Sequence, residues 1–226
     1  MMLFWLLLCI ALHYLWQLAR RVSPWPRLFL GGITWVAGVD VTLAGKPAPG
    51  GTVLLANHVS WIDVPAIAGA SGAAFVAHDG LAAVPLLRWL CRMNGTVFIA
   101  RHDRASVAAQ VAQVRAAIRE RSALAIFPEG TTSDGTGALP FKSSLLSALD
   151  PLPPGIAVQP VRLDYGAGAA DIAWVGEEHG LANFLRILAR WRPLPLTLHF
   201  LPPLAGEALA NRKTIAAAAR GAILGI

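Results

Sequence analysis

Charged side chains and cysteines are both scarce in this chain of 226 residues. Charged residues make up 14% of the sequence, whereas 55% of the residues are hydrophobic. The two cysteines, Cys9 and Cys91, are too few to staple a small secreted domain, so a disulfide framework is excluded and a reducing compartment is expected. The length suits one domain with an appendage.

The signatures of metal and nucleic-acid binding are also missing. The histidines show no HExxH or zinc-finger spacing, and no RNA-recognition signature occurs, so we expect no metal and no nucleic-acid partner. The net charge of +6 is spread along the chain, and an anionic membrane accounts for it better than a nucleic acid does. Residues 166–168 lack the third glycine of a dinucleotide fingerprint, so we interpret them as a loop.

Acidic residues are missing from the first part of the chain. None precedes Asp40, and residues 1–19 carry no charged side chain before Arg20 and Arg21. A helix of that length, at ~1.5 Å per residue, is just long enough to cross a hydrocarbon core. Three membrane arrangements compete: a cleaved signal peptide, a spanning anchor and a helix lying in one leaflet. A buried core helix is the remaining alternative.

The signal peptide is the weakest of these interpretations, because the segment lacks a charged start and a small-x-small cleavage site. The polar His13 and Gln17 weaken a full span, and a second apolar stretch, 28–39, is too short to cross. We therefore predict a membrane-anchoring hairpin of two helices over residues 1–38, split at residues 23–26. Arginines on its downstream side favour placing the following domain on the cytoplasmic face of the cell membrane.

After residue 38, short apolar runs alternate with amphipathic ones, which is typical of an α/β domain. We expect one domain over residues 39–226, with a central, mostly parallel or mixed sheet flanked by helices. The expected strands are 39–44, 52–56, 73–77, 95–100, 123–127, 156–162, 171–175 and 195–201. The expected helices are 63–70, 84–93, 141–149, 179–190 and 207–220, with one more that Asp103 caps and that carries Val107, Val111, Val114 and Ile118 on one face.

An imidazole and a carboxylate stand five residues apart at the end of the strand 52–56. His58 lies where that strand stops, and Asp63 follows in the first turn of the next helix, with Ser60 in the position of an N-cap. An aspartate at that place is favoured by the helix dipole and can turn toward the imidazole. The pair suits a general base with an orienting anion, and a purely structural hydrogen bond is the plainer alternative.

Two further polar loops follow predicted strands. The strand 123–127 leads into the loop 128–133, and the strand 95–100 delivers Arg101 to its carboxyl end. In open α/β sheets, ligands bind beyond the carboxyl ends of the strands. We therefore expect these loops to converge with His58 on one pocket.

Four blocks in this order resemble the lysophosphatidic acid acyltransferase family, the 1-acylglycerol-3-phosphate O-acyltransferases. They are NHxxxxD from Asn57, GxVFIxR from Gly95, FPEGT from Phe127 and VQPV from Val158. The resemblance covers residues 39–200. It implies a glycerolipid acyltransferase fold and a membrane-bound enzyme that moves a fatty acyl group to the free hydroxyl of a lysophospholipid. The leading acceptor is 1-acylglycerol-3-phosphate, which would give phosphatidic acid.

The resemblance also implies roles for the site residues. His58 is implied to be the catalytic base and Asp63 its partner, while Arg101 is implied to bind the phosphate of the acceptor. The block 158–161 is implied to line the acyl side of the pocket. Arginine suits this role because guanidinium binds phosphate bidentately and keeps its charge.

The loop after the strand 123–127 supplies the other candidate binding residues. The resemblance implies that Glu129 and Gly130 contact the acceptor, and Thr131 of the same loop joins them. We interpret Glu129 as a hydrogen-bond acceptor for substrate hydroxyls, for Arg101 or for the loop backbone. Lys142 either supplements the phosphate site or faces water.

The chain also departs from the family pattern. Many members carry a lysine and a glutamate where this chain has residues 78–80, so no lysine from that block assists the acceptor site. Residues 131–144 are similar to a branch that includes lyso-ornithine-lipid acyltransferases. The acceptor is therefore either a lysophosphatidate or a lyso-ornithine lipid.

The expected chemistry needs no cofactor, because the acyl donor, acyl-CoA or acyl-carrier protein, is itself a substrate. A glycerol hydroxyl needs a base within reach, a contribution of roughly 10²- to 10⁴-fold. Backbone N–H groups at the start of the helix after Ser60 are the expected stabilisers of the thioester oxygen. A non-catalytic lipid-binding protein is the alternative from another class, and a thioesterase is disfavoured because no GxSxG elbow occurs.

Overall fold

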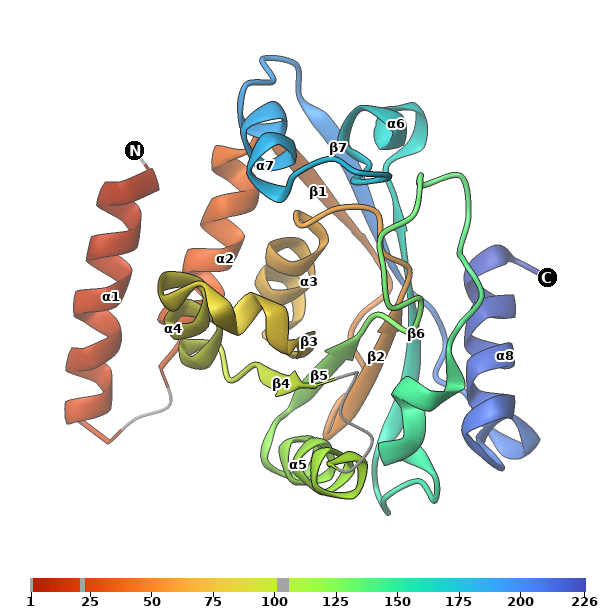
Figure 1. The fold of residues 1–226 in the computed structure, drawn as a ribbon. Helices are drawn as coiled ribbons and strands as arrows, with labels where there is room; N and C mark the ends of the chain where they lie inside the picture. The colour runs from red at the N-terminus through yellow and green to blue at the C-terminus, as the bar shows by residue number, and fades with distance from the viewer. Residues whose placement is uncertain (1, 21–22, 101–105) are drawn as a thin grey trace.

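The apolar run 52–56 lies at the centre of a seven-stranded sheet (Figure 1). The structure, a computed structural model, describes residues 2–20, 23–100 and 106–226. All five residues of the run are buried. A strand whose two faces are both covered by helices reads as a continuous apolar run, which explains why this segment does not alternate.

The sheet is mixed, with five neighbouring parallel strands. The strands are β1 (Val39–Ala44), β2 (Thr52–Ala56), β3 (Ala74–His78), β4 (Val97–Ile99), β5 (Ala123–Ile126), β6 (Ala157–Asp164) and β7 (Leu194–Phe200). Their order is β1-β7-β6-β2-β5-β3-β4. Strands β2 to β6 run parallel to one another, whereas β7 pairs antiparallel with β6 and parallel with β1. The carboxyl ends of β2 to β6 therefore lie at one edge of the sheet.

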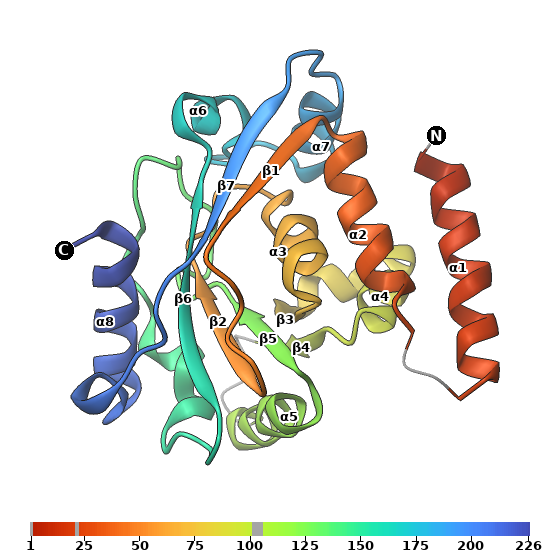
Figure 2. The same cartoon turned by 180° about the vertical axis from the view of Figure 1, so that it is seen from behind.

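Helices cover both faces of the sheet. They are α1 (Met2–Leu18), α2 (Trp25–Val36), α3 (Asp63–Ser71), α4 (Pro85–Met93), α5 (Val107–Glu120), α6 (Ala169–Ile172), α7 (Gly180–Leu188) and α8 (Arg212–Leu224), with 3-10 helices η1 (Asp79–Ala83), η2 (Ser143–Leu149), η3 (Gly166–Gly168) and η4 (Gly206–Leu209). Leu54 of β2 packs on one face with side chains of α3, α6 and α7. Val53 and Leu55 pack on the other face with side chains of α5, η2 and α8. Figures 1 and 2 show α3 and α8 on opposite sides of the sheet.

The α/β class and the mixed sheet agree with the sequence, but one predicted strand is wrong. Residues 171–175 do not form a strand, because Ala169–Ile172 is the short helix α6. Ala169 and Ile172, three residues apart, are buried, and Asp171 between them is exposed. That spacing is helical, and the following apolar residues 173–175 made it resemble a strand.

Two predicted helices differ in kind or extent. The segment 141–149 forms the 3-10 helix η2 over Ser143–Leu149. The segment 207–220 divides into η4 and α8, because the side chain of Asn211 caps the backbone of Lys213 and Thr214 and starts a new helix there. The predicted cap Asp103 lies outside the described residues.

The apolar stripe of α5 is only partly buried. Val107, the first residue of the helix, is 49% exposed, whereas Val114 and Ile118 are buried against the sheet. The buried part of the stripe therefore begins about one helical turn later than predicted. Its buried part packs in the layer that also holds α8.

The first helices pack one behind the other onto the domain. Helix α2 crosses α3 where Gly31 and Gly69 meet, and Arg27 donates to the carbonyl oxygens of Gly69 at 3.0 Å and Ala70 at 2.8 Å. These bonds satisfy carbonyls at the end of α3, where a cation is also favoured by the helix dipole. The second helix of the predicted hairpin is therefore part of the packed domain.

Helix α1 contacts α2 and leaves its outer side uncovered. Trp5 closes over Gly32 of α2, and His13 Nδ1 lies 2.7 Å from Ser23 Oγ in the connection. The exposed large side chains of α1 are Leu3, Phe4, Leu7, Leu8, Tyr14, Leu15 and Leu18. Among the residues that the structure describes, no helix has both the length and the apolar character needed to cross a bilayer.

The crossing of α2 and α3 predicts opposite effects for two similar substitutions. A Cβ at position 69 would lie 2.7 Å from the Cα of Gly31, whereas a Cβ at position 31 would lie 3.5 Å from the Cα of Gly69. Gly69→Ala should lower the free energy of unfolding by about 1–3 kcal/mol through overpacking. Gly31→Ala fits the space and should raise it by up to about 1 kcal/mol through helix propensity. Urea unfolding of both variants tests the pair, and equal shifts would contradict the described crossing.

Candidate active site

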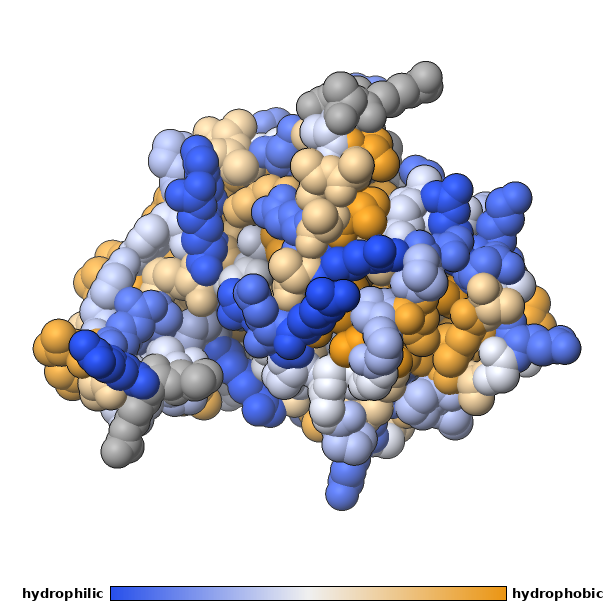
Figure 3. Space-filling view, turned by 90° about the horizontal axis from the view of Figure 1, so that it is seen from below, coloured by the Kyte–Doolittle hydropathy of each residue, from blue (hydrophilic) through white to orange (hydrophobic). Residues whose placement is uncertain are grey.

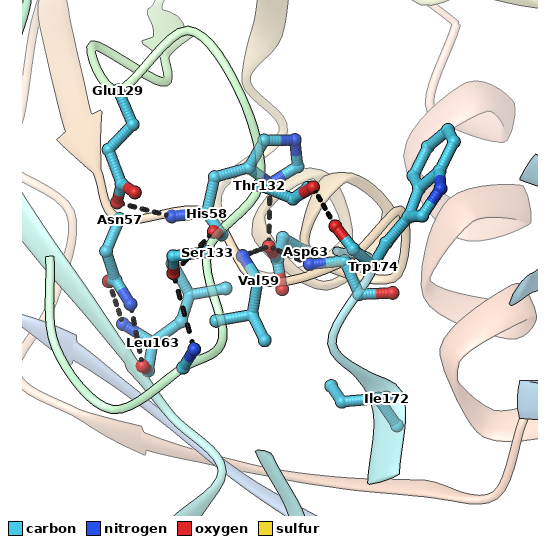
Figure 4. A network of polar contacts seen from close by, with 12 residues as sticks. Asn57, His58, Val59, Asp63, Glu129, Thr132, Ser133, Leu163, Ile172 and Trp174 are labelled. Atoms are coloured by element: carbon cyan, nitrogen blue, oxygen red, sulfur yellow. Dashed lines mark hydrogen bonds and ion pairs between the residues drawn. The ribbon is translucent and has the colours of Figure 1, made fainter. Parts of the chain in front are cut away.

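The imidazole of His58 and the carboxylate of Asp63 face one another at the carboxyl edge of the sheet (Figure 4). The Nδ1 atom of His58 lies 2.7 Å from Oδ2 of Asp63. The Asp63 side chain is fully buried and that of His58 is 18% exposed. The structure therefore brings together the pair predicted from the sequence, with one member reachable from solvent.

Asp63 also binds the backbone of the loop that precedes it. Its Oδ2 accepts hydrogen bonds from the N–H groups of Val59 at 2.6 Å and Ser60 at 2.9 Å. The predicted N-cap is wrong, because Ser60 Oγ lies toward Asn183 Oδ1 at 3.4 Å and the helix begins after Ile62 without a side-chain cap. The carboxylate takes the place of a cap by closing the loop on itself. It occupies these two N–H groups, so they are not free to stabilise a substrate oxygen.

Tyr165 completes the surroundings of Asp63 and was missed in the sequence. Its hydroxyl donates to Oδ1 of Asp63, and the residue is buried. Burial, followed by the nearby Asp63 charge, raises the pKa of Tyr165 well above its usual value, so the phenol stays protonated and acts as a donor. Tyr165 follows β6, the neighbour of β2, so the rule that polar groups gather beyond strand ends would have found it had the strand order been known.

Phe127 fixes the plane of the imidazole. The two rings stack with centroids 4.0 Å apart and planes 15° apart. With Nδ1 directed at Asp63, the neutral ring carries its proton on Nδ1, and Nε2 is the acceptor. His58 therefore has the tautomer and orientation that a general base needs.

Glu129 supports His58 from the neighbouring strand β5. Its Oε1 accepts the backbone N–H of His58 at 3.0 Å, so a loop backbone is one of its partners, in line with one of the three interpretations of Glu129. The residue is 1% exposed, and its Oε2 has no hydrogen-bond partner among the described residues. Burial, with a smaller contribution from the Asp63 charge, raises the pKa of Glu129 to about 7. The carboxyl group is therefore partly protonated near neutral pH.

The loop after Glu129 is tied to the His58 loop. The N–H and the hydroxyl of Ser133 both donate to the carbonyl oxygen of His58, at 2.7 and 3.0 Å. The hydroxyl of Thr132 donates to the carbonyl of Trp174, whose own N–H donates to the carbonyl of Val59 at 3.0 Å. Figure 4 shows the bonds that the hydroxyls of Ser133 and Thr132 make beside Asp63.

Asn57 secures the same loop to β6. Its amide nitrogen donates to the carbonyl of Leu163 at 3.1 Å, and its amide oxygen accepts the N–H of Leu163 at 2.8 Å. The side chain thereby continues the ladder between β2 and β6 beyond the last residue of β2. His58 leaves the sheet from a backbone that is fixed on both sides.

The remaining predicted site residues that the structure describes make no side-chain hydrogen bond to His58 or Asp63. Gly130 is half-buried in a left-handed turn at φ +73°, which favours glycine, whereas Thr131 and the side chain of Lys142 are exposed. The Lys142 backbone N–H donates to the carbonyl of Pro128 at 2.8 Å, so the residue borders the loop. Arg101 lies outside the described residues.

A separate hollow of about 480 Å³ borders the site without including it. It is lined by residues 164–168, by residues 192–195 and by Thr197, Asp171 and Arg190. None of the predicted site residues is among these. The predicted site residues that the structure describes therefore lie outside this hollow.

Metal-binding groups do not gather in the part of the chain that the structure describes. Within residues 2–20, 23–100 and 106–226, no cluster of three or more His, Cys, Asp and Glu side chains could hold an ion.

The raised pKa of Glu129 predicts how stability depends on pH. In Glu129→Gln the amide oxygen can still accept the His58 N–H, but the ionisable group is gone. Between pH 4.5, the ordinary pKa, and about pH 7, the unfolded wild type has released a proton that the folded wild type still holds. The wild type should therefore lose stability relative to the variant as pH rises through this window, and the difference should be constant above it. Urea unfolding across the window measures it, and a flat difference would refute the buried neutral carboxyl.

Comparison with known proteins places this geometry in a family. The family model described as Acyltransferase matches residues 40–164, which is more than half of the chain. The lyso-ornithine lipid O-acyltransferase of Rhodobacter capsulatus is 31% identical over 194 residues, covering 83% of this chain and 70% of that protein. The 1-acyl-sn-glycerol-3-phosphate acyltransferase of Neisseria meningitidis is 36% identical over 135 residues, covering 58% and 52%.

A solved structure supports the fold as well. The crystal structure of the 1-acyl-sn-glycerophosphate (LPA) acyltransferase PlsC from Thermotoga maritima matches with a TM-score of 0.58 and 21% identity, over 99% of this chain and 96% of that one. The matched family region runs from β1 to the end of β6 and contains His58, Asp63 and Glu129. The chain described here belongs to the acyltransferase family.

Proposed function

We propose that the protein transfers a fatty acyl group from a thioester donor to the free hydroxyl of a lysolipid, with His58 as general base. The observation that carries the proposal is the 2.7 Å contact between His58 Nδ1 and Asp63 Oδ2 at the carboxyl edge of the sheet. Because this contact uses Nδ1, the Nε2 atom of the partly exposed His58 ring is left to accept a proton. A base of this kind contributes roughly 10²- to 10⁴-fold to such a reaction.

The reaction follows from the positions of these atoms. The acceptor hydroxyl gives its proton to Nε2 of His58 while its oxygen attacks the thioester carbonyl. The carbon–sulfur bond then breaks, and the leaving thiolate takes the proton back from Nε2. Asp63 stabilises the imidazolium that exists between these two steps, as the carboxylate does in serine hydrolases.

Asp63 suits this role because its own position is fixed. The Val59 and Ser60 N–H groups and the Tyr165 hydroxyl donate to it in addition to His58. A buried carboxylate with all its neighbours in place does not need to reorganise when the imidazole becomes charged. Tyr165 is thus proposed as a positioning residue that acts through Asp63.

The substrates are proposed from the family. The donor is acyl-CoA or acyl-carrier protein, and the first candidate for the acceptor is 1-acylglycerol-3-phosphate, because Arg101 retains the residue type that binds phosphate. A lyso-ornithine lipid is the second candidate, favoured by the relative of that name that covers 83% of the chain. Glu129 Oε2, buried without a partner among the described residues, is proposed to bind an acceptor hydroxyl, with Gly130, Thr131 and Lys142 at the same edge.

Membrane association is proposed from the first helices. The outer side of α1 exposes large apolar side chains, and no acidic residue precedes Asp40. A helix of this kind binds in the interface of one leaflet. The arginines after α1 favour a catalytic domain on the cytoplasmic face of the cell membrane.

Replacing the base tests the proposal directly. His58→Ala should lower kcat for acyl transfer by about 10²-fold or more while the protein stays folded, because no other group takes the hydroxyl proton. The measurement uses full-length protein in detergent, a fatty acyl thioester and a lysolipid acceptor, with thermal unfolding as the check on folding. Unchanged transfer would show that His58 is not the base.

Tyr165→Phe is the graded companion to that variant. Phenylalanine keeps the ring and removes only the hydrogen bond to Asp63, so kcat should fall by about tenfold while KM for both substrates stays the same. A non-catalytic lipid-binding protein would show no turnover in the wild type and equal lipid binding in all three proteins.

A panel of acceptors separates the two candidate substrates. At equal protein, lysophosphatidate should be acylated faster than a lyso-ornithine lipid if Arg101 binds a phosphate. Arg101→Ala should then raise KM for lysophosphatidate by about tenfold or more without changing KM for the donor, because a charge-assisted bidentate contact is lost. Arg119→Ala, at an exposed arginine in the last turn of α5, is the matched control. Preference for the lyso-ornithine lipid, or a KM that does not change in Arg101→Ala, would overturn the phosphate assignment.

A further inference from the structure

Helix α4 is apolar on a side that the protein does not cover. Its sequence contains five large hydrophobic residues, yet no residue between Pro85 and Met93 is buried. Leu86 and Leu87 are 57% and 40% exposed. Val84, just before the helix, is exposed as well. A helix of this composition gains little from packing on the domain, so its apolar side chains are available to another phase or partner.

This surface continues onto α1. The indole N–H of Trp89 in α4 donates to the hydroxyl of Tyr14 in α1 at 3.2 Å. Figure 1 shows α4 in front of α2 and α3, and Figure 2 shows it behind them, so α4 lies on one side of the pair that these two helices form. Seen from below, the hydrophobic side chains at the left edge of Figure 3 lie where α1 ends, beside hydrophilic ones. The apolar side chains of the two helices therefore belong to one side of the molecule.

The charges on these elements are of one sign. Helices α1, α2 and α4 contain no acidic residue. Arg88 and Arg92 are exposed on α4, and Arg20 follows α1. The nearby 3-10 helix η1 carries one acidic residue, Asp79, whose carboxylate lies 3.1 Å from His78 Nε2. Exposed leucines interleaved with arginines and a tryptophan match the interface of an anionic bilayer, where apolar stems enter the acyl region and guanidinium groups meet phosphates.

We infer that the segment from η1 to the end of α4 is a lipid-contacting element, and that α4 and α1 rest together on one anionic phospholipid leaflet. The inference rests on the membrane association proposed above and extends it to an element inside the acyltransferase domain. The segment begins directly after His78, the last residue of β3, at the same edge of the sheet from which His58 emerges. Contact through α4 thus brings the edge with the catalytic pair to the lipid surface, where a lysolipid acceptor resides.

Vesicle binding by the full chain tests this inference. Leu86→Glu places a charge where a leucine would enter the leaflet, and should weaken partitioning onto phosphatidylcholine–phosphatidylglycerol vesicles by about tenfold or more. The matched control is Val107→Glu, at a residue 49% exposed on α5, which should bind as the wild type does. Arg88→Ala/Arg92→Ala should lose affinity for these anionic vesicles and keep its affinity for pure phosphatidylcholine vesicles.

Two further measurements make each outcome decisive. Acyl transfer to an acceptor dispersed in detergent should be the same in the α4 variants as in the wild type. If the proposed acyl transfer is wrong, the wild type shows no transfer in this detergent assay, whereas its binding to vesicles is unaffected. Wild-type vesicle binding by Leu86→Glu would overturn the inference. If Leu86→Glu binds vesicles as the wild type does, and its molecular mass in light scattering differs from that of the wild type, a second copy of the chain covers α4 instead.

Discussion

The buried carboxylate of Asp63 is the group on which the site depends. It accepts hydrogen bonds from two backbone N–H groups of its own loop and from Tyr165, and it contacts the imidazole of His58. A carboxylate without exposure to water needs such partners, because an unpaired buried charge is very costly. The requirement works in both directions. The donors satisfy the anion, and the anion holds the loop and the ring of His58 in one arrangement.

The order of the strands makes that arrangement possible. Because β6, β2 and β5 are neighbours and parallel, their carboxyl ends place Tyr165, His58 and Glu129 at adjoining points of one edge. Glu129 then reaches the backbone N–H of His58 from one side, and Tyr165 reaches Asp63 from the other. In each of these contacts, the two residues follow strands that are not consecutive in the sequence. The sheet brings together groups that are more than 70 residues apart.

This distinction explains what could be predicted from the sequence. The pair His58 and Asp63 is local, five residues apart, and its spacing alone indicated a contact that the structure contains. Most strands were predictable because buried parallel strands are apolar runs between turns. Tyr165 was missed because its role depends on which strand lies beside β2, and the false strand 171–175 arose because four residues are too few to separate a helical from an alternating pattern. Ser60 had the composition of an N-cap, but Asp63 satisfies the loop backbone in its place.

The position of α3 connects the first helices with the chemistry. Its first residue is Asp63, and its last turn receives Arg27 and the glycine crossing from α2. A nine-residue helix is short and stiff, so the element that meets α2 and the carboxylate that orients His58 move as one body. Under the proposed membrane association, the leaflet that holds α1 and α4 then sets the height of His58 above the lipid surface. An acceptor whose chain stays in the leaflet offers its hydroxyl at a similarly fixed height, so binding to the membrane already supplies part of the positioning that acyl transfer requires.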